Sequence, residues 1–299
     1  MTYAFAQLAL VVGGLWQPAQ TGVWQRELQM APRGPLSVVR AIAIRIDPSN
    51  LRFSLDTATR DYGTRGGWTV DRMPAEAVVA LNTGQFHGGA PWGWLVRDGV
   101  ETQPPGSGSV AMAFIVDSAG TPSLIEPAGM AAVRGRVRLA FQSYPALLIG
   151  NGDLPLELRE AGRGVDLAHR DSRLAIGIHR DGSVVLALTR YTGLGGTAPT
   201  LPWGPTVVEM AGLMKSLGCR RAMLLDGGIS SQLALRLEGG SVKRWTNWRA
   251  VPLGMVVTGA DAPTPDRIAA MGLGDTRPAV PNAAAVGRAR NRRVEVVNQ

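Results

Sequence analysis

The sequence contains very little cysteine, lysine and histidine, and each shortage excludes a class of site. Cys219 is the only cysteine, so no disulfide can form within the chain and no cysteine-based metal motif exists. Lys215 and Lys243 are the only lysines, so arginine carries almost all of the positive charge behind the net charge of +8. The few histidines include no pair at the helical spacing of a zinc site. We therefore expect no metal and no cofactor.

The chain also lacks an apolar run long enough to cross a membrane. The longest candidate, residues 4–15, is interrupted by Gln7, whereas a spanning helix needs about 20 apolar residues. No charged side chain precedes Arg26, so this segment resembles the core of a secretory signal, although the basic start of such signals is missing. A buried first strand is the other interpretation. We treat residues 1–37 as a separate N-terminal segment and expect no transmembrane span.

A dense basic stretch with interleaved aromatic residues, the usual mark of nucleic-acid binding, is absent too. The one basic cluster, at residues 288–293, lies at the end of the chain. A composition rich in Arg, Ala, Gly and Pro together explains the positive charge without a nucleic-acid partner. The lone thiol of Cys219 lies in an apolar stretch, which favours buried packing over a nucleophilic role.

What the sequence does contain is a series of short apolar runs separated by turns. Residues 38–46 and 51–56 flank an Asp47-Pro48 turn and predict a hairpin. Residues 174–178 and 184–189, on either side of a charged turn with glycine, predict another. These patterns predict a single domain of the α+β class, with a mixed, mainly antiparallel β-sheet core and few helices.

One helix is predicted over residues 206–217. Thr206 and Glu209 form a capping-box pattern at its start, and Gly218 is placed to end it. The apolar run 222–225 then predicts a short buried strand that Asp226 and two glycines interrupt. We expect the Asp226 carboxylate to emerge at the end of this strand, where loops form sites.

Four segments, in order along the chain, resemble the signature blocks of the phosphodiester glycosidase family. They are Val79-Ala80-Leu81-Asn82-Thr83-Gly84-Gln85-Phe86, Phe141-Gln142-Ser143-Tyr144-Pro145-Ala146-Leu147-Leu148, Ser172-Arg173-Leu174-Ala175-Ile176-Gly177 and Leu224-Leu225-Asp226-Gly227-Gly228-Ile229-Ser230-Ser231. The resemblance covers residues 38–257, and we place one domain over 38–258. A lone Asp-Gly-Gly ends strands in many folds, so the collinear order carries the resemblance.

The resemblance implies hydrolysis of the bond between a sugar's anomeric carbon and a phosphate, with a carbohydrate phosphodiester as substrate. A phosphate monoester leaves readily as an anion, so one carboxylate with donors for the phosphate can suffice. We assign Asp226 as base or nucleophile, Asn82 as a residue that orients substrate and Arg173 as phosphate clamp. The expected substrate-binding residues are Gly227, Gly228, Ser230, Ser231, Gln85, His87, Gln142 and Thr189.

Several positions depart from the family pattern. Thr83 and Tyr144 each replace a glycine, Gln85 replaces a phenylalanine, and Ile229 replaces the third glycine of the last block. Ile229 matters most, because a β-branched residue tolerates a positive φ poorly. Two alternatives therefore stay open: a catalytically silent glycan-binding module, and an ordinary glycosidase with a second carboxylate, for which Asp153 and Glu209 are candidates.

Beyond Thr258 the composition turns to Ala, Pro and Arg, so we separate residues 259–299 as a tail. Residues 271–278 and 287–295 resemble the closing part of an OmpA-like domain, of which only the final third is present. We interpret the tail as a remnant that pairs as a hairpin, with at most peripheral contact with peptidoglycan. This kinship favours a bacterial envelope location, periplasmic or secreted.

Overall fold

The computed structural model describes residues 10–31, 39–57, 67–191, 203–260, 268–272 and 294–298. Two compact units divide the chain, Met1–Ala260 and Asp261–Gln299. The start of the apolar N-terminal run and the basic cluster at 288–293 lie outside the described residues.

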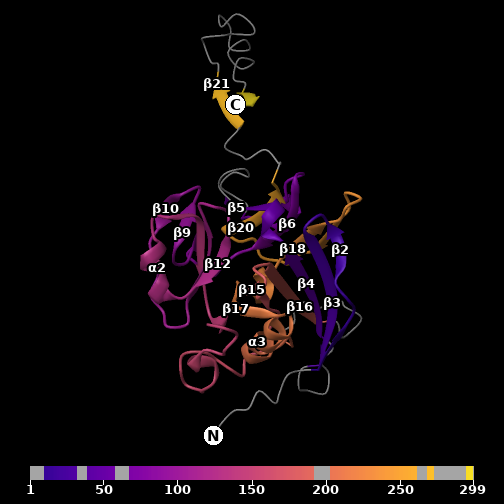
Figure 1. Ribbon diagram of the computed structural model, residues 1–299, viewed down its shortest axis with the longest axis vertical. Coiled ribbons are helices and arrows are strands. Elements are labelled where there is room, and N and C mark those ends of the chain that lie inside the picture. The colour runs from indigo at the N-terminus through magenta and orange to yellow at the C-terminus, as the bar shows by residue number, and fades with distance from the viewer. Residues whose placement is uncertain are drawn as a thin grey trace, which may run out of the picture. The chain divides into compact units, whose positions relative to one another are not determined.

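An eight-stranded sheet is the largest element of the first unit (Figure 1). Its order is β1 (Leu10–Gly13), β3 (Val23–Ala31), β4 (Val39–Ile46), β16 (Val184–Tyr191), β15 (Leu174–His179), β17 (Cys219–Leu224) and β14 (Ala146–Leu148), with β2 (Gln17–Gln20) paired to β3. All of its neighbours pair antiparallel. The segment before residue 38 therefore supplies three strands to the same sheet as β4.

Two five-stranded antiparallel sheets complete the unit. One has the order β10 (Val100–Gln103), β9 (Leu95–Arg97), β13 (Val137–Ser143), β11 (Met112–Asp117) and β12 (Pro122–Ile125). The other has the order β19 (Val242–Trp245), β18 (Leu233–Arg236), β6 (Ala77–Asn82), β20 (Leu253–Gly259) and β5 (Leu51–Thr57). A small ribbon pairs β7 (Phe86–His87) with β8 (Ala90–Pro91).

The three large sheets share one hydrophobic core. Alternate residues of β4, β15 and β16, such as Ile44, Ile176 and Leu186, meet side chains of the other two sheets in a single buried cluster. Burial of this apolar surface stabilises the unit because it removes the surface from water. Phe114 packs edge-on against Phe53, with ring centroids 5.7 Å apart, and so joins the two smaller sheets.

The opposite face of the large sheet is covered by helix α3 (Val207–Ser216). Thr206 caps its first turn, the capping box with Glu209 is complete, and Gly218 follows the helix at φ +85°. The remaining helices among the described residues are short: α2 (Pro127–Val133), and the 3₁₀ turns η1 (Pro48–Asn50), η2 (Val70–Arg72), η3 (Leu156–Leu158) and η5 (Gly228–Ser230). The helix predicted over 206–217 and the α+β class are thus confirmed. All strand pairs in the three large sheets are antiparallel.

The hairpin predicted from residues 38–46 and 51–56 is wrong, although both strands form. β4 pairs with β3 and β16, whereas β5 pairs with β20 in another sheet. The 3₁₀ turn η1, capped by the Asp47 carboxylate, redirects the chain between them. The hairpin predicted at 174–189 is confirmed as β15 and β16, in register from Leu174 opposite Leu188.

The second unit contains one described hairpin, in which β21 (Ile268–Gly272) pairs antiparallel with β22 (Val294–Asn298). Met271 lies opposite Glu295 and Gly272 opposite Val294, so the described ends of the two tail segments that resemble an OmpA-like domain pair with each other. Among the described residues of both units, no helix is long and apolar enough to cross a membrane.

Candidate active site

The loop that follows β17 is the point where distant parts of the chain converge. The backbone N–H of Asp226 donates to Thr83 O at 3.0 Å, and that of Gly228 donates to Ser172 O at 2.8 Å. Two residues before Asp226, at the end of β17 (Cys219–Leu224), the Leu224 N–H donates to Pro145 O at 3.0 Å. Four segments of the chain, those carrying the family-like blocks, therefore meet around Asp226.

The Asp226 carboxylate is half-buried and held by its own loop. The Ser230 hydroxyl and the Gly227 N–H donate hydrogen bonds to it. Burial raises the pKa of the Asp226 carboxyl above its ordinary value, and these two hydrogen bonds oppose the rise because they favour the charged form. A partly desolvated, oriented carboxylate is typical of a catalytic acid, base or nucleophile.

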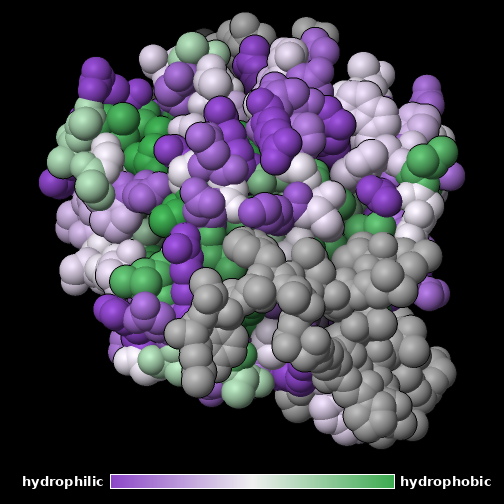
Figure 2. All heavy atoms as spheres, turned by 60° about the horizontal axis from the view of Figure 1, so that its bottom comes forward, coloured by the Kyte–Doolittle hydropathy of each residue, from purple (hydrophilic) through white to green (hydrophobic). Residues whose placement is uncertain are grey.

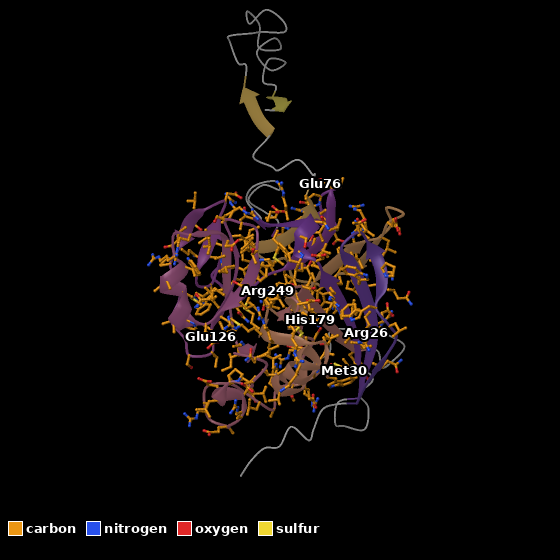
Figure 3. The ribbon with its side chains drawn as sticks, viewed as in Figure 1. Arg26, Met30, Glu76, Glu126, His179 and Arg249 are labelled. Atoms are coloured by element: carbon orange, nitrogen blue, oxygen red, sulfur yellow. The ribbon has the colours of Figure 1, made fainter. Side chains whose placement is uncertain are left out.

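Two charged side chains face Asp226. The positive charge of Arg249 lowers its pKa, and the negative charge of Asp171 raises it. The guanidinium carbon of Arg249 lies over the Phe86 ring, 4.7 Å from the ring centroid, and the backbone N–H of Arg249 donates to Ile229 O at 3.1 Å. Figure 3 shows Arg249 near the middle of the view. Arg249 is therefore an exposed cation whose charge acts on the carboxylate.

Neither Arg249 nor Asp171 was singled out as a functional residue from the sequence. Arg249 lies outside all four family-like blocks, and nothing in its local pattern distinguishes it from the other arginines. Asp171 directly precedes the third block, and an acidic residue two positions before an arginine is common at protein surfaces, so its local pattern does not mark it as a site residue. Arg249 and Asp171 can be recognised only from the folded structure, because the converging loops bring them to Asp226.

Asn82 lies behind the site rather than in it. Its side chain is 0% exposed, its Nδ2 donates to Asp226 O at 2.9 Å, and its Oδ1 accepts from Gln232 N at 2.7 Å. Because both the nitrogen and the oxygen of this amide are hydrogen-bonded to backbone groups, the side chain orients the loop and does not contact the substrate directly. We therefore propose Asn82 as a positioning residue for Asp226.

Gln142 is also enclosed. Its Oε1 accepts from the backbone N–H groups of Trp94 and Gly106, both at 2.8 Å, and its Nε2 donates to Gly106 O at 3.0 Å. Thr189 is fully buried as well, and its Oγ1 accepts from Arg173 N at 2.8 Å. The structure thus places both residues in the supporting framework, away from solvent.

Gln85 and His87 belong to the loop that starts at Thr83. Gln85 is half-buried, its Nε2 donates to Tyr144 O at 2.6 Å, and its Oε1 accepts from the Ser143 hydroxyl at 2.9 Å. It ties the first loop to the second. His87 is exposed in the β7–β8 ribbon, next in sequence to the Phe86 ring that carries Arg249.

The serines of the last block have different surroundings. Ser230 donates to the Asp226 carboxylate, as described above. Ser231 is fully buried, its hydroxyl donates to Gly228 O at 2.9 Å, and its carbonyl accepts from Arg190 Nη2 at 2.9 Å. Burial lowers the pKa of Arg190 to about 10. Arg190 also donates to Trp245 O and Thr246 O, so it fastens the loop before Arg249 to the last block.

The backbone of Arg173 lies beside the site, since a Cβ added to Gly227 would lie 3.9 Å from the Cα of Arg173. Its Nη2 donates to His169 O at 2.8 Å and its Nε to Pro205 O at 3.3 Å. Burial lowers the pKa of its guanidinium, and the charge of Asp171 opposes that shift. The structure therefore brings together Asp226, Gly227, Gly228, Ser230 and Arg173, with Asn82 beneath them.

The substitution at Ile229 is compatible with the loop. Among the described non-glycine residues only Asp98 has a positive φ, whereas Gly228 adopts +56°. Ile229 lies inside η5 and its side chain is 45% exposed. The strained position of this loop is thus occupied by glycine, and Ile229 meets no backbone conflict.

The other candidates lie elsewhere or have a structural role. Gly152, next to Asp153, approaches Cys219 O at the start of β17, so Asp153 lies at the opposite end of that strand from Asp226. Glu209 completes the helix cap and forms an ion pair with Arg170 at 2.8 Å. Cys219 is buried, and burial raises the pKa of its thiol to about 12, which suits packing. Among the described residues, no cluster of three or more Asp, Glu, His or Cys side chains could hold a metal ion.

Known proteins share this architecture. The chain resembles the zebrafish N-acetylglucosamine-1-phosphodiester alpha-N-acetylglucosaminidase catalytic domain auto-inhibited by its pro-peptide, with TM-score 0.59, 15% identity and coverage of 86% of this chain and 94% of that one. A hypothetical protein from Synechocystis has TM-score 0.50 and 17% identity over 81% of this chain and 64% of that one. A putative exported protein from Burkholderia pseudomallei has TM-score 0.46 and 15% identity, covering 74% of each. No curated protein sequence matches significantly.

The likeness to the zebrafish and Synechocystis structures shows a shared fold, and a match to the family's sequence pattern establishes the family. Residues 75–258, more than half of the chain, match the phosphodiester glycosidase family. The matched range includes every loop that converges on Asp226, and it confirms the resemblance found in the sequence. The chain belongs to the phosphodiester glycosidase family.

Proposed function

We propose that this protein hydrolyses a sugar-1-phosphodiester at the bond between the anomeric carbon and the phosphate oxygen. The observation that supports this most is the half-buried Asp226 carboxylate facing the exposed guanidinium of Arg249. A sugar phosphodiester needs both charges, a carboxylate at the anomeric carbon and a cation at the phosphate.

In this proposal Asp226 acts at the anomeric carbon, as nucleophile or base. Ser230 and the Gly227 N–H hold its carboxylate in one orientation, and Asn82 holds its backbone. The leaving phosphate monoester is a stable anion, so protonation by a strong acid is unnecessary. Family membership and the converged loops support this assignment, which comes from the residues of this chain.

Arg249 is the proposed phosphate-binding residue, together with Arg173 from the neighbouring segment. An arginine presents a planar fork of donors that matches phosphate oxygens, and stacking on Phe86 orients that fork. Gly227 and Gly228 leave space for a sugar to approach the backbone closely. Gln85, His87 and Tyr144, on adjoining loops, are proposed to contact the sugar or the group beyond the phosphate.

The substrate class proposed is a sugar-1-phosphodiester of a glycan or envelope glycopolymer. The zebrafish protein acts, by its name, on an N-acetylglucosamine-1-phosphodiester, which makes that sugar the first to test. A periplasmic or secreted location remains our prediction, motivated by the tail that resembles the end of an OmpA-like domain.

The test is a panel of sugar-1-phosphate esters, with release of the phosphate monoester measured by a coupled phosphatase. We expect turnover of at least one ester by the wild-type chain and a loss of at least about 10³-fold in Asp226→Asn. Asp153→Asn, at the other end of β17, is the matched carboxylate control and should retain full turnover. Saturable glycan binding without product release would instead identify a catalytically silent glycan-binding module.

A further inference from the structure

A second carboxylate, that of Asp171, lies at the same loop as Asp226. The Gly228 N–H donates to the carbonyl of Ser172, the residue after Asp171, at 2.8 Å. A Cβ added to Gly228 would lie 2.8 Å from Asp171 Oδ2, so any side chain at 228 would collide with the carboxylate. The glycine that follows the catalytic carboxylate by two residues therefore also makes room for Asp171.

The Asp171 segment is held firmly from the other side. A Cβ added to Gly204 would lie 2.0 Å from Asp171 O, so the chain at Gly204 packs directly against this backbone. Asp171 Oδ1 accepts from Ser172 N at 2.7 Å. These contacts fix one carboxylate oxygen and leave Oδ2 facing Gly228 and His169.

His169 connects Asp171 to solvent. Its Nε2 lies 3.7 Å from Asp171 Oδ2, and the side chains of His169 and Asp171 are 53% and 25% exposed. A carboxylate paired with an exposed imidazole can pass an accepted proton through that imidazole to bulk water. Arg173 and Asp226 are the other charged groups that face Asp171.

We propose that Asp171 is the base that activates the water in the second half of the reaction, with His169 as the group that carries the proton to solvent. This inference rests on the proposed function. Glycosidases that form a covalent intermediate use two carboxylates in these two roles, close together on either side of the reacting carbon.

The proposed reaction has two half-reactions. The Asp226 carboxylate attacks the anomeric carbon, the bond from that carbon to the phosphate oxygen breaks, and its electron pair leaves with the phosphate monoester. A water molecule then gives a proton to Asp171 as its oxygen bonds to the anomeric carbon, and the bond to Asp226 breaks with its electron pair returning to that carboxylate. The proton passes from Asp171 through His169 to solvent.

The test combines Asp171→Ala with azide, a nucleophile that needs no base. With the phosphodiester that the wild-type chain hydrolyses fastest, the variant should release one burst of phosphate monoester and accumulate a glycosyl ester on Asp226, visible by mass spectrometry of the intact protein. Azide should then restore turnover about tenfold or more and yield a glycosyl azide, because base catalysis is worth about 10²–10⁴-fold. A variant impaired only in folding would not respond to azide.

His169→Gln should retain turnover but lose it progressively in weak buffer, with recovery on adding imidazole, a readout that loss of packing would not produce. Asp153→Asn again serves as the control and should respond to neither azide nor imidazole. Unchanged turnover in Asp171→Ala, or a slow variant with no burst and no azide product, would overturn the role of Asp171. Absence of turnover in the wild-type chain would instead overturn the proposed function, and this inference with it.

Discussion

The Nδ2 of Asn82 donates to the backbone carbonyl of Asp226 at 2.9 Å across 144 residues of sequence. The same amide accepts from Gln232 N, so it connects the end of β6 to both sides of the Asp226 loop. A side chain with no exposed surface thereby controls where a half-buried carboxylate lies. The strand ends are the fixed frame, and the site is assembled from the loops that leave them.

Asp226→Asn should be more stable to unfolding than the wild-type chain at neutral pH. Burial raises the folded-state pKa of Asp226, so the stability that this group contributes is present below its unfolded pKa of about 4 and lost as pH rises through the folded value. A neutral amide avoids that loss. Urea unfolding of both proteins at pH 7 and at pH 4 should show a gain that shrinks at the lower pH.

Arg249→Ala should weaken substrate binding by about 10–100-fold, since charge-assisted hydrogen bonds contribute about 1.5–3 kcal/mol each. Arg249→Lys should recover only part of this, because a lysine keeps the charge but loses the planar fork and the stacking on Phe86. Initial-rate kinetics on the same phosphodiester measure both variants. Equal activity of the three proteins would remove Arg249 from the phosphate site.

Gln142→Ala should lower the free energy of unfolding by about 1–3 kcal/mol, because it leaves the buried N–H of Trp94 and the half-buried N–H of Gly106 without their acceptor. Denaturant unfolding measures the loss. In protein that remains folded, KM should stay within about twofold of the wild-type value, since Gln142 contacts no solvent. A large rise in KM at unchanged stability would restore its assignment as a substrate-binding residue.

Ile229→Gly, which recreates the triple glycine of the family pattern, should leave turnover within about twofold of wild type. The strained φ belongs to Gly228, and Ile229 is half-exposed within a helical turn. The added backbone freedom should cost about 0.5–1 kcal/mol of stability. Kinetics and thermal unfolding of the purified variant test both statements, and a strong gain in turnover would show that Ile229 restrains the site.

Local pattern predicted the individual elements well. The capping box at Thr206, the glycine after the helix and the charged turn between β15 and β16 each act over a few residues, so their geometry follows from sequence. The prediction that β4 pairs with β5 is wrong, because two adjacent apolar runs with a turn between them are compatible with a hairpin and equally with strands in two different sheets. Only burial against distant strands chose between these outcomes.

The candidate site divides in the same way. Asp226, Gly228 and Ser230 were identified because they are contiguous and follow a buried strand, and the order of the four blocks indicated the family. Asn82 and Gln142 are residue types that often bind ligands. Their burial and their hydrogen bonds to backbone groups, which only the structure shows, indicate a supporting role.

Contiguous residues and their order were enough to predict the α+β class, the family and a carboxylate at the end of a buried strand. The charged side chains around that carboxylate could be identified only after the chain was seen folded. Arg249 and Asp171 come to Asp226 from separate loops, and electrostatic interaction depends on distance in space. Hydrogen bonds between the strand ends set the distances from Asp226 to Arg249 and Asp171, and these distances cannot be predicted from separation along the sequence.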